Sequence, residues 1–226
     1  MIRVIKPAGL GNIQLEEVPT PTPGPDEVLA RTDVTLISRG SELFARYIRD
    51  EAVSPSIMGY SLAGRVEAVG DDVLTYGVGD RVMIVAPHAT HAIGTPRDTD
   101  GRMVCLPDDV SEEAATFLPL VTSAVAWADS SGVRPGDTVV VLGQGLVGSL
   151  MLQVLRTRDV GRIIAVDALA SRCDLSRSLG ADIVVNARET DPVAAVRSAT
   201  DGAGADLVID CVGGKRKQKK KKRIQE

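Results

Sequence analysis

The feature that most constrains the fold of this sequence is a glycine-rich turn between an apolar run and an amphipathic segment. Residues 138–142 form a β-branched, aliphatic run, and Gly143, Gly145 and Gly148 follow directly in the spacing G-x-G-x-x-G. Apolar residues then recur at helical spacing up to Leu155. Strand, turn and helix stand in the order that a dinucleotide-binding βαβ unit requires. The alternative is a glycine turn in some other α/β domain.

Each glycine of this turn has a separate predicted role. Gly143 permits the tight turn, Gly145 lets a pyrophosphate approach the backbone, and Gly148 lets the helix pack closely on its strand. The helix N-terminus offers free N–H groups and a partial positive charge to the phosphates. We therefore expect six consecutive residues to contact a dinucleotide: Gly143, Gln144, Gly145, Leu146, Val147 and Gly148.

An acidic residue ends the next predicted strand. Residues 163–166 read as a buried strand, and Asp167 follows them, 19 residues after Gly148. A carboxylate at this spacing accepts hydrogen bonds from the adenosine ribose and repels a 2′-phosphate, which favours NAD. Arg172, five residues later, offers a phosphate partner, so NADP is left open.

The second half of the chain alternates strands and helices. Apolar runs at 138–142, 163–166, 183–185 and 207–209 are separated by helical patterns at about 146–157, 169–179 and 191–200. This alternation predicts a parallel sheet covered on both faces. A complete domain of this kind has six strands, and four precede Gly214, so we expect a partial domain with an exposed edge.

The first half reads differently. Short β stretches broken by Gly, Pro and Asp turns predict a small β-barrel. A short helix is expected from Ser41 to Ile48, and a longer one over 114–128 is expected to link the two domains.

Composition fits a globular protein in a reducing compartment. The chain has 226 residues, of which 44% are apolar and 25% charged, values that are ordinary for such proteins. It shows no secretory signal and no apolar stretch that reads as a membrane span. Its three cysteines are far apart and form no CxxC. We therefore expect a cytoplasmic protein with no membrane partner.

The net charge of −4 hides an asymmetry. The last twelve residues hold eight Lys and Arg and one Glu, whereas the rest has 18 Lys and Arg against 29 Asp and Glu. Such a tail could bind nucleic acid in a salt-sensitive way. Like-charge runs usually stay unfolded and bind without specificity, so we expect a basic disordered tail over 215–226 and no specific nucleic-acid partner.

The order of landmarks along residues 1–214 resembles that of the medium-chain dehydrogenase/reductase family, which includes the zinc alcohol dehydrogenases. These landmarks are Gly40-Ser-Glu42, Gly59-Tyr-Ser61, 64–70, 79–82, 106–109, 118–122 and Gly143–Gly148. The resemblance implies an α/β protein with a GroES-like β-barrel catalytic domain over 1–120 and a partial Rossmann NAD(P)-binding domain over 121–214. In that family, substrate and nicotinamide occupy the cleft between the two domains.

The chain departs from the zinc-containing members at every ligand position. Where those members carry the catalytic zinc ligands and a nearby Glu, this sequence has Arg39, Tyr60, Leu118 and Ser61. The stretch for the family's structural zinc holds only Cys105. Because tetrahedral zinc needs at least three good protein ligands, we expect no zinc and no other metal, as in the family's zinc-free branch with Gly-Tyr-Ser.

The resemblance also implies site residues. Ser41 matches the Ser/Thr that hydrogen-bonds the substrate oxygen, and Tyr60 replaces a ligand facing the same cleft, so these are the expected catalytic residues. The structural alternatives are that Ser41 caps the 41–48 helix and that Tyr60 fills the volume of the missing metal site. Thr122 matches a residue beside the nicotinamide, and Val212 and Gly213 match the loop after the fourth strand.

The only histidines, His88 and His91, stand three residues apart. With no third ligand nearby in sequence, we expect them to be rim residues of the barrel rather than metal ligands; a role as catalytic acid is left open.

The activity that the resemblance implies is hydride transfer between a nicotinamide and a small alcohol or carbonyl substrate without zinc. The alternatives are an NADPH-dependent enoyl or quinone reductase, and an inactive truncated fragment that still binds nucleotide or a partner. A homodimer is left open.

Overall fold

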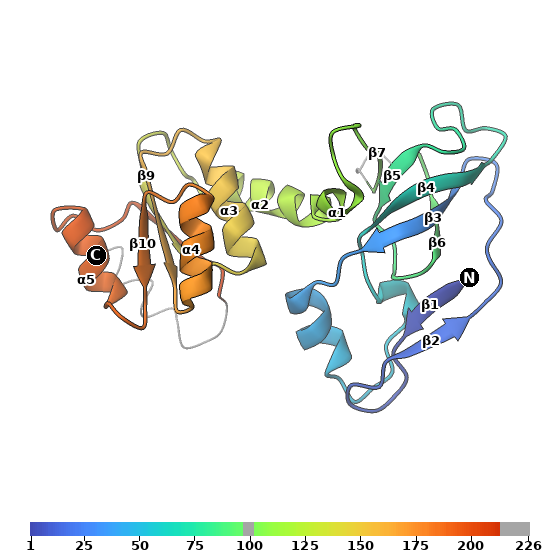
Figure 1. The fold of residues 1–226 in the computed structure, drawn as a ribbon, viewed down its shortest axis with the longest axis horizontal. Coiled ribbons are helices and arrows are strands. Elements are labelled where there is room, and N and C mark those ends of the chain that lie inside the picture. The colour runs from blue at the N-terminus through green and yellow to red at the C-terminus, as the bar shows by residue number, and fades with distance from the viewer. Residues whose placement is uncertain (97–101, 213–226) are drawn as a thin grey trace. The chain divides into compact units, whose positions relative to one another are not determined.

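The computed structural model describes residues 1–96 and 102–212. These residues fall into two compact units, Met1–Pro119 and Leu120–Glu226, each of which has its own core (Figure 1). The expected basic tail over 215–226 and the expected cofactor contact Gly213 lie outside the described residues.

Unit 1 is built on a five-stranded antiparallel sheet in the order β6-β3-β4-β5-β7. Its strands are β3 (Val28–Thr35), β4 (Leu62–Val69), β5 (Arg81–Ile84), β6 (His91–Gly94) and β7 (Met103–Cys105). A separate antiparallel pair, β1 (Ile2–Ile5) and β2 (Gln14–Glu17), joins the rest of the unit through isolated bridges from Arg3 to Ala89 and from Lys6 to Val53. The expected short strands with frequent turns are confirmed.

The helices of unit 1 differ in detail from the predictions. A π-type helical segment, η1, runs from Arg39 to Tyr47, and a single 3₁₀ turn, η2, covers Pro55–Ile57. Ser38 is the N-cap of η1, so Ser41 stands inside the helical segment. The interpretation of Ser41 as a helix cap was therefore wrong.

The expected continuous helix over 114–128 is two helices. Helix α1 covers Glu112–Ala115, with Ser111 Oγ accepting from the N–H of Ala114 at 3.1 Å. Helix α2 covers Leu118–Ser130. Pro119 explains the break, because a proline has no N–H to continue the hydrogen bonds of a preceding helix and is tolerated in the first turn of a new one.

Unit 2 is a parallel sheet in the order β10-β9-β8-β11. Its strands are β8 (Thr138–Leu142), β9 (Arg162–Asp167), β10 (Ile183–Asn186) and β11 (Leu207–Asp210), and its crossover helices are α3 (Leu146–Arg156), α4 (Ala170–Ser178) and α5 (Pro192–Ala199). The four predicted strands and three predicted helices are all confirmed.

Both faces of this sheet are buried, which explains the uninterrupted apolar runs in the sequence. Val139 and Val141 of β8 pack against residues of α2 and α3 in one cluster. The alternate residues Val140 and Leu142 pack in a second cluster with residues of α5. Among the described residues, no helix has the length and apolar character needed to cross a membrane.

The fold sets an order of thiol reactivity that can be tested. Cys105 is exposed, Cys173 is buried and Cys211 is half-buried. Burial, aided by Asp210, raises the pKa of Cys211 to about 11, and burial also raises the pKa of Cys173. Because the thiolate is the reactive form, iodoacetamide at pH 8 should modify Cys105 first, as measured by peptide mass spectrometry. Equal rates at Cys105 and Cys211 in folded protein would contradict this packing.

Candidate functional site

The glycine turn of unit 2 lies where the strand order changes direction. From β8 the chain proceeds to β9 and β10 on one side of the sheet, and it returns to β11 on the other side of β8. In open parallel sheets, ligands bind outside the carboxyl ends of the strands at such a switch point. Residues 143–145 form the turn at that end of β8. The topology therefore places the predicted dinucleotide contacts at the preferred edge of the sheet.

The backbone conformation at Gly143 requires a glycine. Its φ is +85°, in the left-handed region that disfavours side chains. Its N–H donates to the carbonyl of Val166 at 2.7 Å, which joins the turn to the end of β9. A Cβ at this position would lie 2.5 Å from Cγ2 of Val212, so the loop after β11 also packs on the turn.

The other two glycines differ from each other in what surrounds them. A Cβ on Gly148 would lie 1.8 Å from the carbonyl oxygen of Gly143, so helix α3 rests directly on the turn. A Cβ on Gly145 would meet only Nη1 of Arg172, at 3.9 Å, among the described residues. Gly148 is thus needed for packing, whereas Gly145 leaves open space above the backbone.

The start of α3 gives this open space its polarity. Gly145 is the N-cap, and its carbonyl accepts the first helical hydrogen bond, from Ser149 N–H at 2.9 Å. The N–H groups of the first helical turn have no acceptor within the helix. Leu146 is 38% exposed and Val147 is half-buried, so this turn reaches the surface. The arrangement suits a phosphate.

Asp167 is held firmly at the end of β9. Its Oδ1 accepts from the N–H groups of Ala168 and Leu169 at 2.7 and 2.9 Å, and its Oδ2 accepts from Gln144 N–H at 2.7 Å. Nη1 of Arg172 lies 3.6 Å from Oδ2. Burial raises the pKa of Asp167, but these amides and Arg172 outweigh it and lower the pKa overall. The carboxylate is therefore ionised at neutral pH.

The hydrogen bonds of Asp167 limit what else it can bind. A carboxylate accepts at about four lone-pair sites, and backbone amides occupy three of them. Oδ2 keeps one acceptor position, which is enough for a hydroxyl group. The carboxylate thus has a structural function, fastening β9 to the turn, in addition to any contact with a ribose.

The remaining predicted cofactor contacts differ in how far their side chains are exposed. Gln144 is only 1% exposed, and its Nε2 donates to Val141 O at 2.9 Å, so its side chain turns into the protein. Its Oε1 has no hydrogen-bond partner among the described residues. Val212 is 47% exposed, and its N–H donates to Asp210 Oδ1 at 2.9 Å. Thr122 is exposed on α2.

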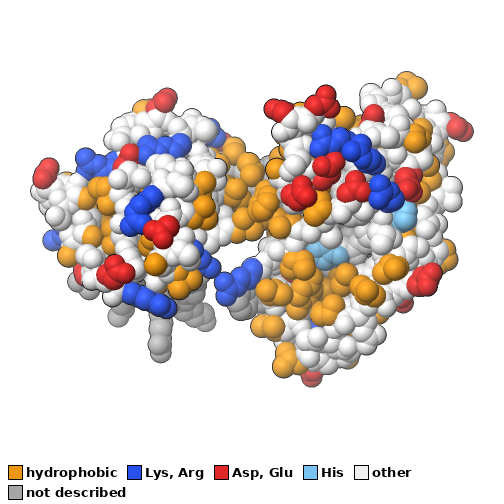
Figure 2. Space-filling view, in the orientation of Figure 1, with side chains coloured by type: hydrophobic (Ala, Val, Ile, Leu, Met, Phe, Trp, Pro, Cys, Tyr) orange, Lys and Arg blue, Asp and Glu red, His pale blue; other side chains and the backbone are white. Residues whose placement is uncertain are grey.

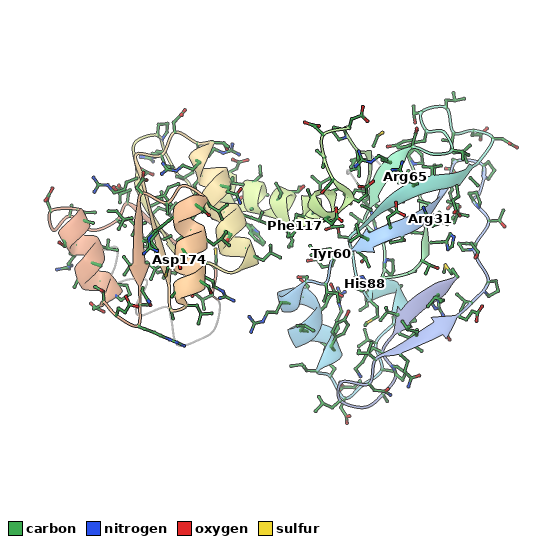
Figure 3. All side chains as sticks on the ribbon, viewed as in Figure 1. Arg31, Tyr60, Arg65, His88, Phe117 and Asp174 are labelled. Carbon is green, nitrogen blue, oxygen red and sulfur yellow. The ribbon has the colours of Figure 1, made fainter. Side chains whose placement is uncertain are left out.

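The two predicted catalytic residues belong to unit 1. Ser41 is exposed on η1, and its Oγ accepts from Ser38 Oγ at 3.4 Å. Tyr60 is half-buried in the segment between η2 and β4 and lies near His88 in Figure 3. Its neighbour Ser61 is buried, and Ser61 Oγ donates to the carbonyl of Thr116 at 2.6 Å.

A buried polar network that the sequence did not reveal lies next to these residues. His88 is 4% exposed and Glu42 is fully buried, and His88 Nε2 lies 2.7 Å from Glu42 Oε2. The Tyr47 hydroxyl donates to Glu42 Oε2 at 2.9 Å, and Ser38 N–H donates to Glu42 Oε1 at 2.8 Å. On the other side of the ring, His88 Nδ1 meets Thr35 Oγ1 at 2.5 Å.

These contacts correct the expectation that both histidines lie on the rim of the barrel. His88 is a core residue, so its interpretation as a rim histidine was wrong; His91 is partly exposed, 3.2 Å from Glu67.

Burial raises the pKa of Glu42, but hydrogen bonds from His88, Ser38 and Tyr47 lower it overall. Burial and Glu42 raise the pKa of Tyr47, so that hydroxyl keeps its proton. No sequence signal links Glu42 to His88, which are 46 residues apart.

The surface around this network includes an apolar patch. Figure 2 shows hydrophobic side chains gathered on the part of unit 1 that includes η1. The large hydrophobic residues that are exposed in and beside η1 and η2 are Ile37, Leu43, Ile48 and Ile57. Among the described residues, no three His, Cys, Asp or Glu side chains come together in a group that could hold a metal.

Two family models match the chain. The model described as alcohol dehydrogenase GroES-like domain matches residues 24–110, and the model described as zinc-binding dehydrogenase matches residues 147–220. The chain belongs to the medium-chain alcohol dehydrogenase-like family. Unit 1 holds the GroES-like domain and unit 2 the Rossmann-type sheet, which confirms the predicted fold class.

Curated relatives of this dehydrogenase-family chain are similar over most of its length. An NAD-dependent alcohol dehydrogenase of Sulfurisphaera tokodaii is 29% identical over 234 residues, covering 88% of this chain and 67% of that protein. Sorbitol dehydrogenase of Bacillus subtilis is 27% identical, covering 89% and 65%. The chain thus spans about two thirds of the length of these relatives.

Solved structures agree with this assignment. Alcohol dehydrogenase TADH from Thermus sp. ATN1 matches with a TM-score of 0.82 at 25% identity, over 99% of this chain and 74% of that one. A putative zinc-binding dehydrogenase from Sinorhizobium meliloti, bound to NADP, matches with a TM-score of 0.85 at 22% identity, over 100% and 74%. At that identity the second match supports the fold alone.

The surroundings of Gly148 and Gly145 predict that alanine substitution lowers the stability of unit 2 at the first position and not at the second. Gly148→Ala forces a Cβ against the carbonyl of Gly143, and overpacking of this kind costs about 1–3 kcal/mol. Gly145→Ala meets open space and should leave the free energy of unfolding nearly unchanged. Urea denaturation followed by circular dichroism measures both. Equal stability of the two variants would contradict the close approach of α3 to the turn.

Proposed function

We propose that this chain is a nicotinamide-dependent oxidoreductase that acts on a small alcohol or carbonyl compound without a catalytic zinc. The observation that carries the proposal is the open backbone at Gly145, bordered by the start of α3 and by the ionised Asp167. The family assignment supports the same class of chemistry.

The residues around the glycine turn fit a dinucleotide. A pyrophosphate would lie over Gly145, where a Cβ would stand in open space, and would accept from the N–H groups that begin α3. The remaining acceptor position on Asp167 Oδ2 would bind a ribose hydroxyl. When bound, the nicotinamide supplies the hydride chemistry. The protein supplies its position and the polarity around it.

The environment of Asp167 supports NAD over NADP. A 2′-phosphate would meet an ionised carboxylate, which repels it. Arg172 is the basic group that could compensate, but its Nη1 lies 3.6 Å from that carboxylate and already balances its charge. Binding of NADP would therefore require this ion pair to separate.

The side chains at the family's zinc positions do not fit zinc. Tyr60 and Ser61 are poor zinc ligands, and the Ser61 hydroxyl is already bonded to the carbonyl of Thr116. Arg39 and Leu118 supply no oxygen, sulfur or imidazole donor from their side chains. We therefore propose that the hydroxyls of Ser41 and Tyr60 polarise the substrate oxygen by hydrogen bonding.

The surroundings of these hydroxyls favour a substrate that carries hydrocarbon groups. Exposed aliphatic side chains at Ile37, Leu43 and Ile57 lie in or beside the segments that carry Ser41 and Tyr60. An apolar surface of this kind binds the hydrocarbon groups of a substrate.

The first experiment is a fluorescence titration with NADH and, separately, with NADPH. We expect saturable NADH binding with a dissociation constant on the order of micromolar, and NADPH binding about tenfold weaker or more. Gly145→Val should abolish binding, because its side chain fills the space above the backbone. Gly40→Val, the same change at an open position in unit 1, is the matched control. Folded protein that binds neither nucleotide would overturn the proposal.

A reductase of activated alkenes is the second candidate. The observation in its favour is a relative named acryloyl-coenzyme A reductase, from Sulfurisphaera tokodaii, which is 26% identical over 94% of this chain. Stronger binding of NADPH than of NADH would favour this candidate. Binding without turnover of any alcohol, aldehyde or enoyl compound would instead favour an inactive nucleotide-binding chain.

The proposed absence of zinc is tested separately. Protein purified from zinc-supplemented medium should contain no stoichiometric zinc by plasma mass spectrometry, and turnover should be unchanged by a chelator. One zinc per chain, with activity lost on chelation, would contradict the proposed role of the two hydroxyls.

A further inference from the structure

The pair formed by Glu42 and His88 calls for a physical explanation. Both side chains are almost completely buried, at 0% and 4% exposure. Removing ionisable groups from water costs free energy, and a buried pair is often no more stable than apolar residues of the same volume. A position of this kind is often retained because it fixes an arrangement of neighbouring groups. The contacts of the pair show which groups it fixes.

On one side, His88 and its partner Thr35 hold the backbone around Tyr60. The N–H of His88 donates to Met58 O at 2.7 Å, and Thr35 Oγ1 donates to Ser61 O at 2.9 Å. The His88 ring packs directly on Gly59, where a Cβ would lie 2.7 Å from Cγ of the ring. The segment is therefore fixed before and after Tyr60.

On the other side, Glu42 holds both ends of η1. Its Oε1 accepts from the N–H of Ser38, the N-cap residue, and its Oε2 accepts from the hydroxyl of Tyr47, the last residue of the segment. Ser41 stands on this segment, directly before Glu42. The backbone position of Ser41 therefore depends on the Glu42 carboxylate.

His88 is the group that joins the two sides. The Glu42 carboxylate only accepts hydrogen bonds, so Nε2 of His88 donates in their 2.7 Å contact, while Nδ1 on the opposite edge of the ring contacts Thr35 Oγ1 at 2.5 Å. An imidazole ring has two polar atoms on opposite edges, so it can bridge a carboxylate and a hydroxyl rigidly. No aliphatic side chain of similar size could do so.

We propose that His88 is a positioning residue that fixes the segments carrying Ser41 and Tyr60 relative to each other. It acts through Glu42 on η1 and through Thr35 and Gly59 on the Tyr60 segment. The catalytic part of this inference rests on the proposed function, in which the Ser41 and Tyr60 hydroxyls contact the substrate. The structural part concerns unit 1 alone.

The test uses the three tyrosines of the chain, Tyr47, Tyr60 and Tyr76. They are labelled as 3-fluorotyrosine, and their ¹⁹F resonances are assigned by single Tyr→Phe variants. Tyr47 reports on the Glu42 side, Tyr60 reports on the other side, and Tyr76, which packs with the core of the five-stranded sheet, is the internal control.

The expected result is selective. His88→Ala should shift or broaden the resonances of both Tyr47 and Tyr60 and leave Tyr76 unchanged, whereas His91→Ala should leave all three unchanged. Thr35→Val, which replaces the hydroxyl by a methyl group, should change the resonance of Tyr60 and spare that of Tyr47.

If His88→Ala does not fold, His88→Gln replaces it, because the glutamine amide still reaches Glu42 but not Thr35. The resonance of Tyr60 should then change more than that of Tyr47. An unchanged Tyr60 in a folded His88 variant would overturn the proposal.

The kinetic arm separates this inference from the proposed function. For any substrate that the unmodified protein turns over, His88→Ala should lower kcat by about 100-fold, as misplaced catalytic groups do. The NADH dissociation constant should stay the same, because the glycine turn and Asp167 belong to unit 2. Protein without turnover would count against the proposed function, while the ¹⁹F spectra would still decide whether His88 positions the two segments. An unchanged kcat in an active His88→Ala variant would overturn the catalytic part.

Discussion

The structure of unit 2 depends on how closely one helix approaches one carbonyl group. Because Gly148 has no side chain, α3 rests on the carbonyl of Gly143, and the glycine turn is held in a single conformation. That conformation directs the first amides of α3 outward and brings the N–H of Gln144 to the carboxylate of Asp167. The polarity of the candidate site thus follows from a packing contact, with no charged residue inside the turn itself.

Unit 1 achieves order by different means. Distant segments of this unit are joined by a hydrogen-bonded set of side chains centred on His88 and Glu42. Hydrogen bonds require each donor to face its own acceptor. The segment around Tyr60 is therefore held by several directional contacts, two of which share the Thr35 hydroxyl.

Periodicity and spacing predicted unit 2 well, because its information is local. Runs such as 138–142 are apolar throughout since both faces of the strand are covered, and Asp167 directly ends its strand. Unit 1 was less predictable. The short strands were evident, but η1 begins two residues before the expected helix, and Pro119 divides a segment that its composition had made look continuous. The pairing of Glu42 with His88 depends on the three-dimensional path of the chain, which no spacing rule encodes.

The contact between Gly59 and His88 also restricts how this site could change during evolution. Gly59 has a φ of +106°, and the imidazole ring occupies the place that a side chain at this position would need. A larger residue at 59 is disfavoured by this φ and would also meet the backbone N of His88 at 2.7 Å, so a glycine is required there even without the ring. The loss of His88 in turn leaves Glu42 buried without its main partner. Introducing a histidine at Tyr60 would not by itself create a zinc site, since the side chains of Arg39 and Leu118 offer no suitable donor. A change at Gly59 or at His88 is thus unfavourable on its own, which couples the two positions.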